Sequence, residues 1–137
     1  MDLLRCKVRL SVLWLAMFAG TVASMFLGLL TPGTIKEVMG GTWGGEKLSE
    51  GMLIMYAFFF IIPAVLAILS LTLNGSANRW LNFILGIIWV LGLIFELVRE
   101  ATGEMTMYIA SYLMFAAGII IAPYIAYFAS KLPKQQA

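Results

Sequence analysis

The chain has 137 residues, of which 62% are hydrophobic and 12% are charged, and its mean hydropathy is +0.97. A soluble domain is nearer about 45–50% apolar, so one small core would leave too much apolar surface in water, and a lipid bilayer is the expected solvent. The net charge of +2 argues against a nucleic-acid partner, and the absence of histidine removes the commonest metal ligand, the usual haem ligand and the usual general base. We expect no cofactor.

Four apolar runs are each close to the ~20 residues that a helix needs to cross ~30 Å of hydrocarbon. They cover residues 10–30, 52–73, 80–98 and 105–129. Helices are expected because a segment in lipid must satisfy its own backbone polar groups. Short second and third connections force neighbouring helices to run antiparallel. We therefore predict an all-α polytopic membrane protein, with residues 1–137 forming a single antiparallel bundle of four transmembrane helices.

The first apolar run has a second interpretation. A basic start and the stretch Thr21–Val22–Ala23 are compatible with a cleaved signal peptide, but the run continues to Leu30, which favours a retained span. Cys6, the single cysteine, is either an ordinary thiol, which we favour, or a palmitoylation site.

Small residues recur at every fourth position in two of the spans. The first span carries Ala16, Gly20, Ser24 and Gly28, and the last carries Gly118, Ala122 and Ala126. Such stripes allow close approach of helix backbones where no hydrophobic force drives association. We favour a contact between the two stripes inside the bundle. The alternative is an interface between copies of the chain.

The loop at residues 31–51 contains a short amphipathic segment. Thr34, with Glu37 three residues later, weakly matches a capping box that would start a short helical turn. Ile35, Val38 and Met39 fall on one side of that turn, which suits a segment lying flat at the outer interface.

The same loop holds a tryptophan between two glycine pairs. Trp43 lies between Gly40–Gly41 and Gly44–Gly45, and the glycines allow the chain to reverse closely. Ser49 is expected to cap the second span. We predict that residues 31–51 form an outer lid, which covers either a ligand site or, as we favour, only lipid-facing apolar surface.

Two prolines lie inside spans. Pro63 is near the middle of the second span and Pro123 in the inner half of the fourth. Each removes a backbone donor, so each is either a tolerated kink, which we favour, or a functional hinge.

Ionisable groups at membrane depth mark the chemistry of pumps and membrane enzymes. Within the four spans the only acid is Glu96, near the outer end of the third. Arg99 follows three residues later and shares its face. The pair has two functional interpretations, a gate of a pore or an anion-binding site. We favour a third, in which the polar end of the helix contacts lipid headgroups.

The remaining polar residues of the spans are few, and we predict that they form no relay. They are Thr21, Ser24, Ser70, Thr72 and Asn82. Asn78, before Arg79 and Trp80, is the expected N-cap of the third span.

Positive charge predicts the orientation of the spans. Six basic residues lie on the side of the termini and three on the other: Arg5, Lys7, Arg9, Arg79, Lys131 and Lys134 against Lys36, Lys47 and Arg99. Aromatic residues near the boundaries agree, with Trp14, Trp80, Tyr124 and Tyr127 on the inner side and Tyr56, Tyr108 and Tyr112 on the outer. We predict a multi-pass protein of the inner (plasma) membrane with both termini cytoplasmic.

Several short motifs occur together along most of the chain. They are Leu13–Trp14, Pro32–Gly33 followed by Lys36–Glu37, the run 40–45, Glu50–Gly51, Ile62–Pro63, Leu69–Ser70, the run 77–80 and the closing run 131–133. With these motifs the chain resembles a family of small four-helix prokaryotic membrane proteins catalogued as a domain of unknown function, with DoxX-like proteins as looser relatives. The resemblance implies a fold and a membrane location. The family pattern has acids within its first, second and fourth spans, whereas this chain has apolar or small residues there, such as Ile61.

Three functions are compatible with these features. We favour a non-catalytic membrane protein that acts through helix packing, as a self-associating or accessory subunit whose partners are the lipid bilayer and itself or another membrane protein. The second is a small channel or transporter with hinges at Pro63 and Pro123 and the Glu96–Arg99 pair at its outer mouth. The third, suggested by the DoxX-like kinship, is a redox-associated subunit.

Overall fold

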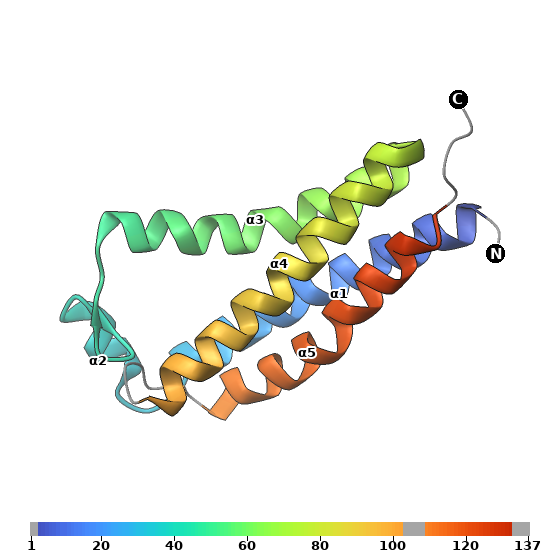
Figure 1. The fold of residues 1–137 in the computed structure, drawn as a ribbon. Helices are drawn as coiled ribbons and strands as arrows, with labels where there is room; N and C mark the ends of the chain where they lie inside the picture. The colour runs from blue at the N-terminus through green and yellow to red at the C-terminus, as the bar shows by residue number, and fades with distance from the viewer. Residues whose placement is uncertain (1–2, 103–108, 133–137) are drawn as a thin grey trace.

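A computed structural model describes residues 3–102 and 109–132 (Figure 1). Its elements in chain order are α1 (Leu3–Leu29), α2 (Thr34–Met39), β1 (Thr42–Trp43), β2 (Glu46–Lys47), α3 (Glu50–Thr72), α4 (Gly75–Ala101) and α5 (Ile109–Ser130). The four long helices correspond to the four predicted spans. Residues 103–108, which include the predicted start of the last span and Tyr108, lie outside the described residues.

Three of the described helices, α1, α3 and α4, are long and apolar enough to cross a membrane. α5 adds a shorter apolar segment, Phe115–Ser130. Only 17% of the most apolar window of each of the three helices is buried inside the protein. Many of the remaining large apolar side chains are exposed, which is the distribution expected when lipid replaces water as the solvent.

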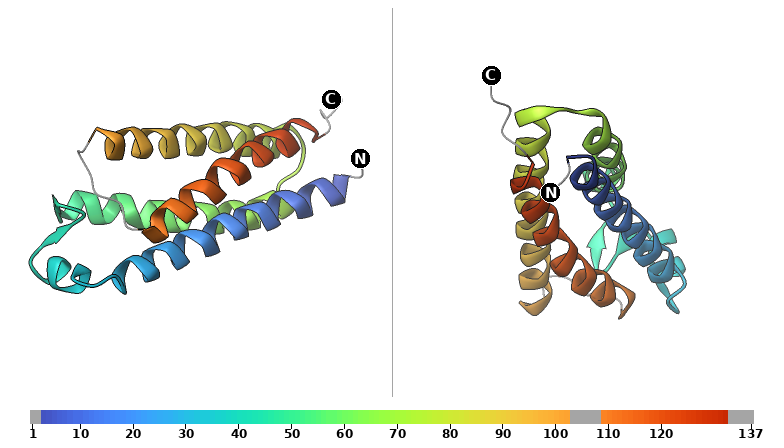
Figure 2. Two further views of the ribbon diagram at one scale, coloured as in Figure 1. Left: turned by 90° about the horizontal axis from the view of Figure 1, so that it is seen from below. Right: turned by 90° about the vertical axis from the view of Figure 1, so that its right-hand side faces the viewer.

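The helices are arranged as two pairs. α1 packs along α3, α5 packs along α4, and contact between α1 and α5 joins the pairs (Figure 2). α3 and α4 meet near their connecting turn and then diverge (Figure 1). α4 runs back in roughly the opposite direction to α3, as the short connection predicts, although the two helices lie close only near their turn. Both chain ends and the α3–α4 turn lie at one end of the molecule, the termini end, and the β-hairpin lies at the other, the hairpin end.

Small residues explain why α4 pairs with α5. A Cβ atom added to Gly86 of α4 would lie 3.3 Å from the backbone nitrogen of Ala126 and 3.6 Å from the carbonyl oxygen of Ala122. A Cβ added to Gly118 would lie 2.8 Å from a methyl carbon of Leu93. The small-residue stripe of α5 therefore packs against α4, which corrects our favoured pairing of that stripe with the stripe of α1.

The stripe of α1 is only partly used inside the protein. Ala16 is exposed, Gly20 and Ser24 are half-buried, and Gly28 is buried. α1 instead buries a different face, led by Leu10, Trp14 and Met17, because these large side chains fill the space between the two helix pairs.

Trp14 corrects the predicted aromatic belt. Its side chain is fully buried, with its ring 5.9 Å from the ring of Trp89, which in turn lies 5.1 Å from Phe59. Of the other described belt residues, Trp80, Tyr112, Tyr124 and Tyr127 are exposed, as the prediction requires, whereas Tyr56 is half-buried.

The outer loop contains a two-stranded antiparallel hairpin, which was not among the predicted elements. Thr42 faces Lys47 and Trp43 faces Glu46, with Gly44 and Gly45 at the turn. Both glycines have positive φ, 58° and 84°, as a type I′ turn requires. The prediction that this glycine pair reverses the chain closely is confirmed.

The N-cap of α3 agrees with the sequence prediction, and the N-cap of α2 does not. Ser49 caps α3 as predicted, because its hydroxyl accepts a hydrogen bond from the Met52 amide at 3.3 Å. The capping box at Thr34 is wrong: Gly33 occupies the N-cap of α2 with φ 93° and no side-chain cap, and the Thr34 hydroxyl is buried without a partner. The Glu37 carboxylate instead accepts a hydrogen bond from the Gly45 amide at 2.9 Å, which ties α2 to the hairpin.

Candidate functional site

The predicted Glu96–Arg99 pair is present at the hairpin end of α4. One turn of helix places the two side chains on the same face, with 4.0 Å between an Arg99 Nη and a Glu96 Oε. Both side chains are mostly covered, with 28% of Glu96 and 21% of Arg99 exposed. Thr102 donates a hydrogen bond to the Arg99 carbonyl oxygen at 3.0 Å, within the last turn of the helix.

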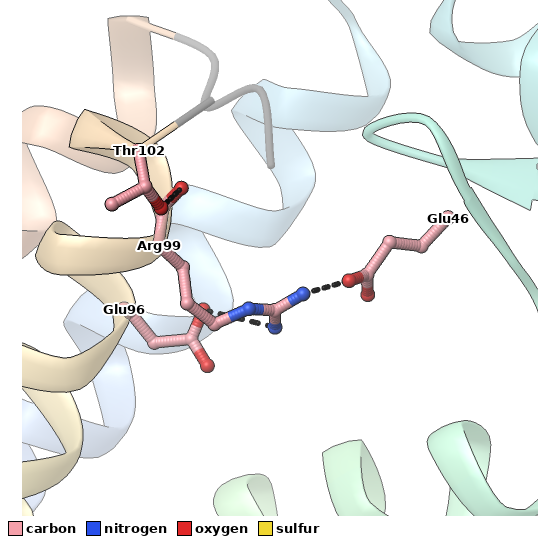
Figure 3. A network of polar contacts seen from close by, with 4 residues as sticks. All are labelled: Glu46, Glu96, Arg99 and Thr102. Carbon is pink, nitrogen blue, oxygen red and sulfur yellow. Dashed lines mark hydrogen bonds and ion pairs between the residues drawn. The ribbon is translucent and has the colours of Figure 1, made fainter. Parts of the chain in front are cut away.

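Arg99 has a second carboxylate partner that lies far away in the sequence. Its guanidinium donates a hydrogen bond to Glu46 of β2 and forms an ion pair with it (Figure 3). Its carbon Cζ also lies 5.9 Å from the ring centre of Phe95. The outer loop is therefore attached to α4 through one arginine flanked by two carboxylates, and we name Glu46, Glu96 and Arg99 the outer ion cluster.

The hairpin geometry places Glu46 in this cluster. Because the turn at Gly44–Gly45 holds β1 against β2, Glu46 pairs directly with Trp43, which is half-buried. Glu46 attaches the loop at residues 31–51, the predicted lid, to Arg99 of α4. What the lid covers stays a prediction.

The chemistry available at the outer ion cluster is electrostatic. Two carboxylates around one guanidinium give the outer ion cluster a formal charge of −1, which favours a cation over an anion beside it. Within residues 3–102 and 109–132, no three acidic, cysteine or histidine side chains come together in a way that would hold a metal ion.

A second polar group lies inside the protein, toward the termini end. The indole nitrogen of Trp14 donates to Asn82 Oδ1 at 2.6 Å, and the Ser70 hydroxyl lies 2.8 Å from the same oxygen. Asn82 Nδ2 donates to the backbone oxygen of Asn78 at 2.8 Å and to its Oδ1 at 2.6 Å. Trp14, Ser70, Asn78 and Asn82 thus join α1, α3 and α4, and we name them the amide cluster.

The amide cluster is neutral and well satisfied. Asn78 Nδ2 uses its two protons on the carbonyl oxygens of Ser70 and Leu73, both at 2.9 Å. These two carbonyls are near the end of α3, where helix carbonyls lack an intrahelical partner. The cluster therefore closes the α3–α4 turn and holds Trp14 against it. Ser70 and Asn82, two of the polar residues of the spans, are thus hydrogen-bonded to each other, and that these residues form no relay stays a prediction.

Lys7 extends this polar region at the termini end. Its side chain is buried, and its ammonium group donates to Asn74 Oδ1 and to the Leu71 carbonyl oxygen, the latter at 3.4 Å. A positive charge at the C-terminal end of α3 is favoured by the helix dipole. Lys7 thus attaches the start of α1 to the α3–α4 turn.

Asn78 is not the N-cap of α4. The helix begins one turn earlier, at Gly75, with Asn74 at the N-cap and Gly75 at φ 65°. The chain reverses within Asn74–Gly75, so Asn78 lies inside the helix and is buried. The spacing of Asn74, Asn78 and Asn82, four residues apart in an apolar helix, was the signal in the sequence that would have identified this face.

Both prolines lie within unbroken helices. Pro63 is buried in α3. Pro123 is exposed in α5, where it lines a shallow cavity of about 230 Å³, open to the surroundings, with Tyr124 and Tyr127. Neither residue belongs to the outer ion cluster. Cys6 is buried and its thiol donates to the Phe128 carbonyl oxygen at 3.8 Å, which agrees with the interpretation as an ordinary thiol.

A comparison with protein families finds a match over almost the whole chain. No curated protein and no solved structure matches it. A family model described as a family of unknown function, DUF6326, matches residues 4–135, a range that includes all four long helices, the hairpin, the outer ion cluster and the amide cluster. The looser DoxX-like kinship stays a prediction. From this nearly full-length match it follows that the chain belongs to DUF6326.

Proposed function

We propose that the protein is an integral membrane protein that crosses the bilayer four times, with both termini cytoplasmic, and that it acts without catalysis as a self-associating or accessory subunit. The observation that carries this proposal is the outward-facing apolar surface of the long helices. Large side chains such as Phe58, Ile88 and Phe95 are 59%, 54% and 61% exposed. Such surface requires lipid or another apolar helix against it.

The amide cluster supports a role in packing. Its members are neutral, and its asparagine protons are used within the protein, so it rigidifies the junction of three helices instead of offering a titratable group. In membranes, hydrogen bonds of this kind contribute to helix association because no water competes for them.

The small-residue stripe of α1 is the surface through which we propose self-association. Ala16 is exposed and Gly20 is half-buried, whereas the α5 stripe is occupied by α4. A neighbouring helix could approach α1 closely at this stripe.

Gly20→Leu is expected to break a native complex, because the added side chain keeps the two helix backbones apart. The mass of the complex in mild detergent and the oligomer number in nanodiscs measure this effect. Gly92→Leu serves as the control, since nothing lies within 4 Å of a Cβ at that position. A wild-type chain that is monomeric in nanodiscs, or a complex that survives Gly20→Leu, rules out self-association through this stripe.

A channel or transporter is the second candidate, supported by the outer ion cluster. α3 and α4 diverge toward the hairpin end, and Arg99 links the hairpin to α4 there. Opening of the Arg99–Glu46 pair would release the hairpin and leave Glu96 and Glu46 to attract cations.

Glu96→Gln is expected to change cation flux into liposomes by several-fold if this second function is correct, because it removes one of the two carboxylates beside Arg99. Glu50→Gln is the matched control: it has the same charge change at the same end of the molecule, but its side chain is exposed in the first turn of α3. Flux that is absent from the wild type, or identical in both variants, excludes the transport function.

A further inference from the structure

An aromatic surface with a cavity lies on α5 at the termini end. The cavity is a shallow hollow of about 230 Å³ that is widely open to the surroundings, and it is lined by Pro123, Tyr124 and Tyr127. Helical spacing brings these three residues to one face, because Tyr127 follows Pro123 by one turn. Both tyrosines are 53% exposed, and Ile120, one turn deeper in the helix, is 62% exposed. The face is therefore apolar along its length and open to the surroundings.

Two cations border this surface, one from each of two helices. The ammonium of Lys131, in the residues that follow α5, lies 5.4 Å from the ring centre of Tyr127. The guanidinium of Arg9, on α1, lies 5.3 Å from the ring centre of Phe128. Phe128 in turn packs against both cavity-lining tyrosines, with ring centres 6.4 Å from Tyr124 and 5.3 Å from Tyr127. Positive charge thus flanks the apolar cavity at the end where the chain begins and ends.

We propose a binding site for one anionic phospholipid, in the leaflet that meets the chain termini. The site is formed by Arg9, Pro123, Tyr124, Tyr127 and Lys131. The inference rests on the proposed membrane location. An acyl chain occupies the cavity and continues along Ile120, and the lipid phosphate lies between the two cations. Charge complementarity selects this ligand, because an apolar cavity takes any acyl chain whereas two cations favour a headgroup with net negative charge. Tyrosine rings suit this depth, since the ring is apolar and the hydroxyl reaches the headgroups.

Native mass spectrometry of the full-length protein in mild detergent tests the site. Phosphatidylglycerol and phosphatidylcholine with identical acyl chains are titrated separately, and the fraction of protein carrying one lipid gives an apparent Kd for each. We expect phosphatidylglycerol to bind several-fold more tightly. Lys131→Gln should weaken its binding roughly fivefold, the factor that corresponds to one basic residue near an anionic headgroup. Lys131→Arg should keep the wild-type affinity.

Arg79→Gln is the matched control. Arg79 is also at the termini end and also lies over an aromatic ring, 5.7 Å from Trp80, but Trp80 does not line the cavity. Its removal should leave phosphatidylglycerol binding unchanged, whereas Arg9→Gln should weaken it about as much as Lys131→Gln. Tyr124→Ala should weaken the binding of both lipids equally, because it removes part of the cavity wall and removes no charge.

Three results would overturn the site: equal affinity for the two lipids, no loss in Lys131→Gln, or an equal loss in Arg79→Gln. If a variant does not fold, raising the ionic strength of wild-type samples replaces it, since screening must weaken phosphatidylglycerol binding and leave phosphatidylcholine binding unchanged. A protein that carries neither lipid would also overturn the site, whereas the proposed membrane location fails only if the chain stays in solution without detergent.

Discussion

Replacing Asn82 with leucine should destabilise the protein by roughly 2–3 kcal/mol, because two buried polar groups then lose their partner. The indole N–H of Trp14 donates to Asn82 Oδ1, and Asn78 Oδ1 accepts from Asn82 Nδ2. Leucine has a similar volume, so the loss reports hydrogen bonding more than packing. Unfolding in mixed micelles, followed by labelling of the buried Cys6 thiol, measures the change.

Thr72→Val is the control for loss of a polar side chain. Thr72 is exposed, and its hydroxyl bonds only to carbonyl oxygens of its own helix, so its loss should cost less than about 0.5 kcal/mol. Ser70→Ala should fall between the two, because Asn82 Oδ1 keeps the Trp14 donor. An Asn82→Leu protein as stable as the wild type would show that the amide cluster does not hold the three helices together.

Gly86→Leu should separate α4 from α5 and cost about 3 kcal/mol or more, since overpacking forces backbones to move. A Cβ at Gly86 would already lie 3.3 Å from both the Ala126 nitrogen and a methyl carbon of Ile125. A backbone neighbour cannot rotate away as a flexible side chain does. The free energy of unfolding in mixed micelles tests the expectation.

Gly92→Leu in the same helix isolates this steric effect. Both substitutions replace glycine with a better helix former, a gain of roughly 1 kcal/mol. At Gly92 nothing lies within 4 Å of an added Cβ, so this variant should be as stable as the wild type or more stable. Equal destabilisation by the two variants would mean that α4 and α5 do not approach closely at Gly86.

Elements with strong local signals were predicted well. The apolar runs predicted all four long helices, because about twenty apolar residues with at most one charge have few alternatives to a helix. The Ser49 cap and the reversal at Gly44–Gly45 also follow from local chemistry, since a hydroxyl before a helix and a glycine at positive φ act on their own neighbours. Glu96 and Arg99 were found because three residues along a helix return to the same face.

Contacts between distant residues were missed or misplaced. Glu46 and Arg99 are 53 positions apart, and nothing near either residue indicates the other. Trp14 was assigned to the membrane boundary because a tryptophan near a span end is typical of the aromatic belt. Its burial depends on Asn82, 68 positions away, as a hydrogen-bond acceptor. Asn78 was assigned to the N-cap of α4 because the start of the helix was placed one turn too late.

The sequence by itself determined the number of long helices, their apolar character and the chemistry of the loop, because these depend on residues within one or two turns of each other. Only the tertiary structure decided that α4 pairs with α5, that α3 diverges from α4, and that the hairpin is joined to Arg99. Those outcomes depend on which helix surfaces fit closest. Close packing at Gly86 requires a complementary backbone surface opposite the glycine, and the buried amide of Asn82 requires hydrogen-bond partners. Hydropathy along the chain does not specify which residues lie opposite these two positions.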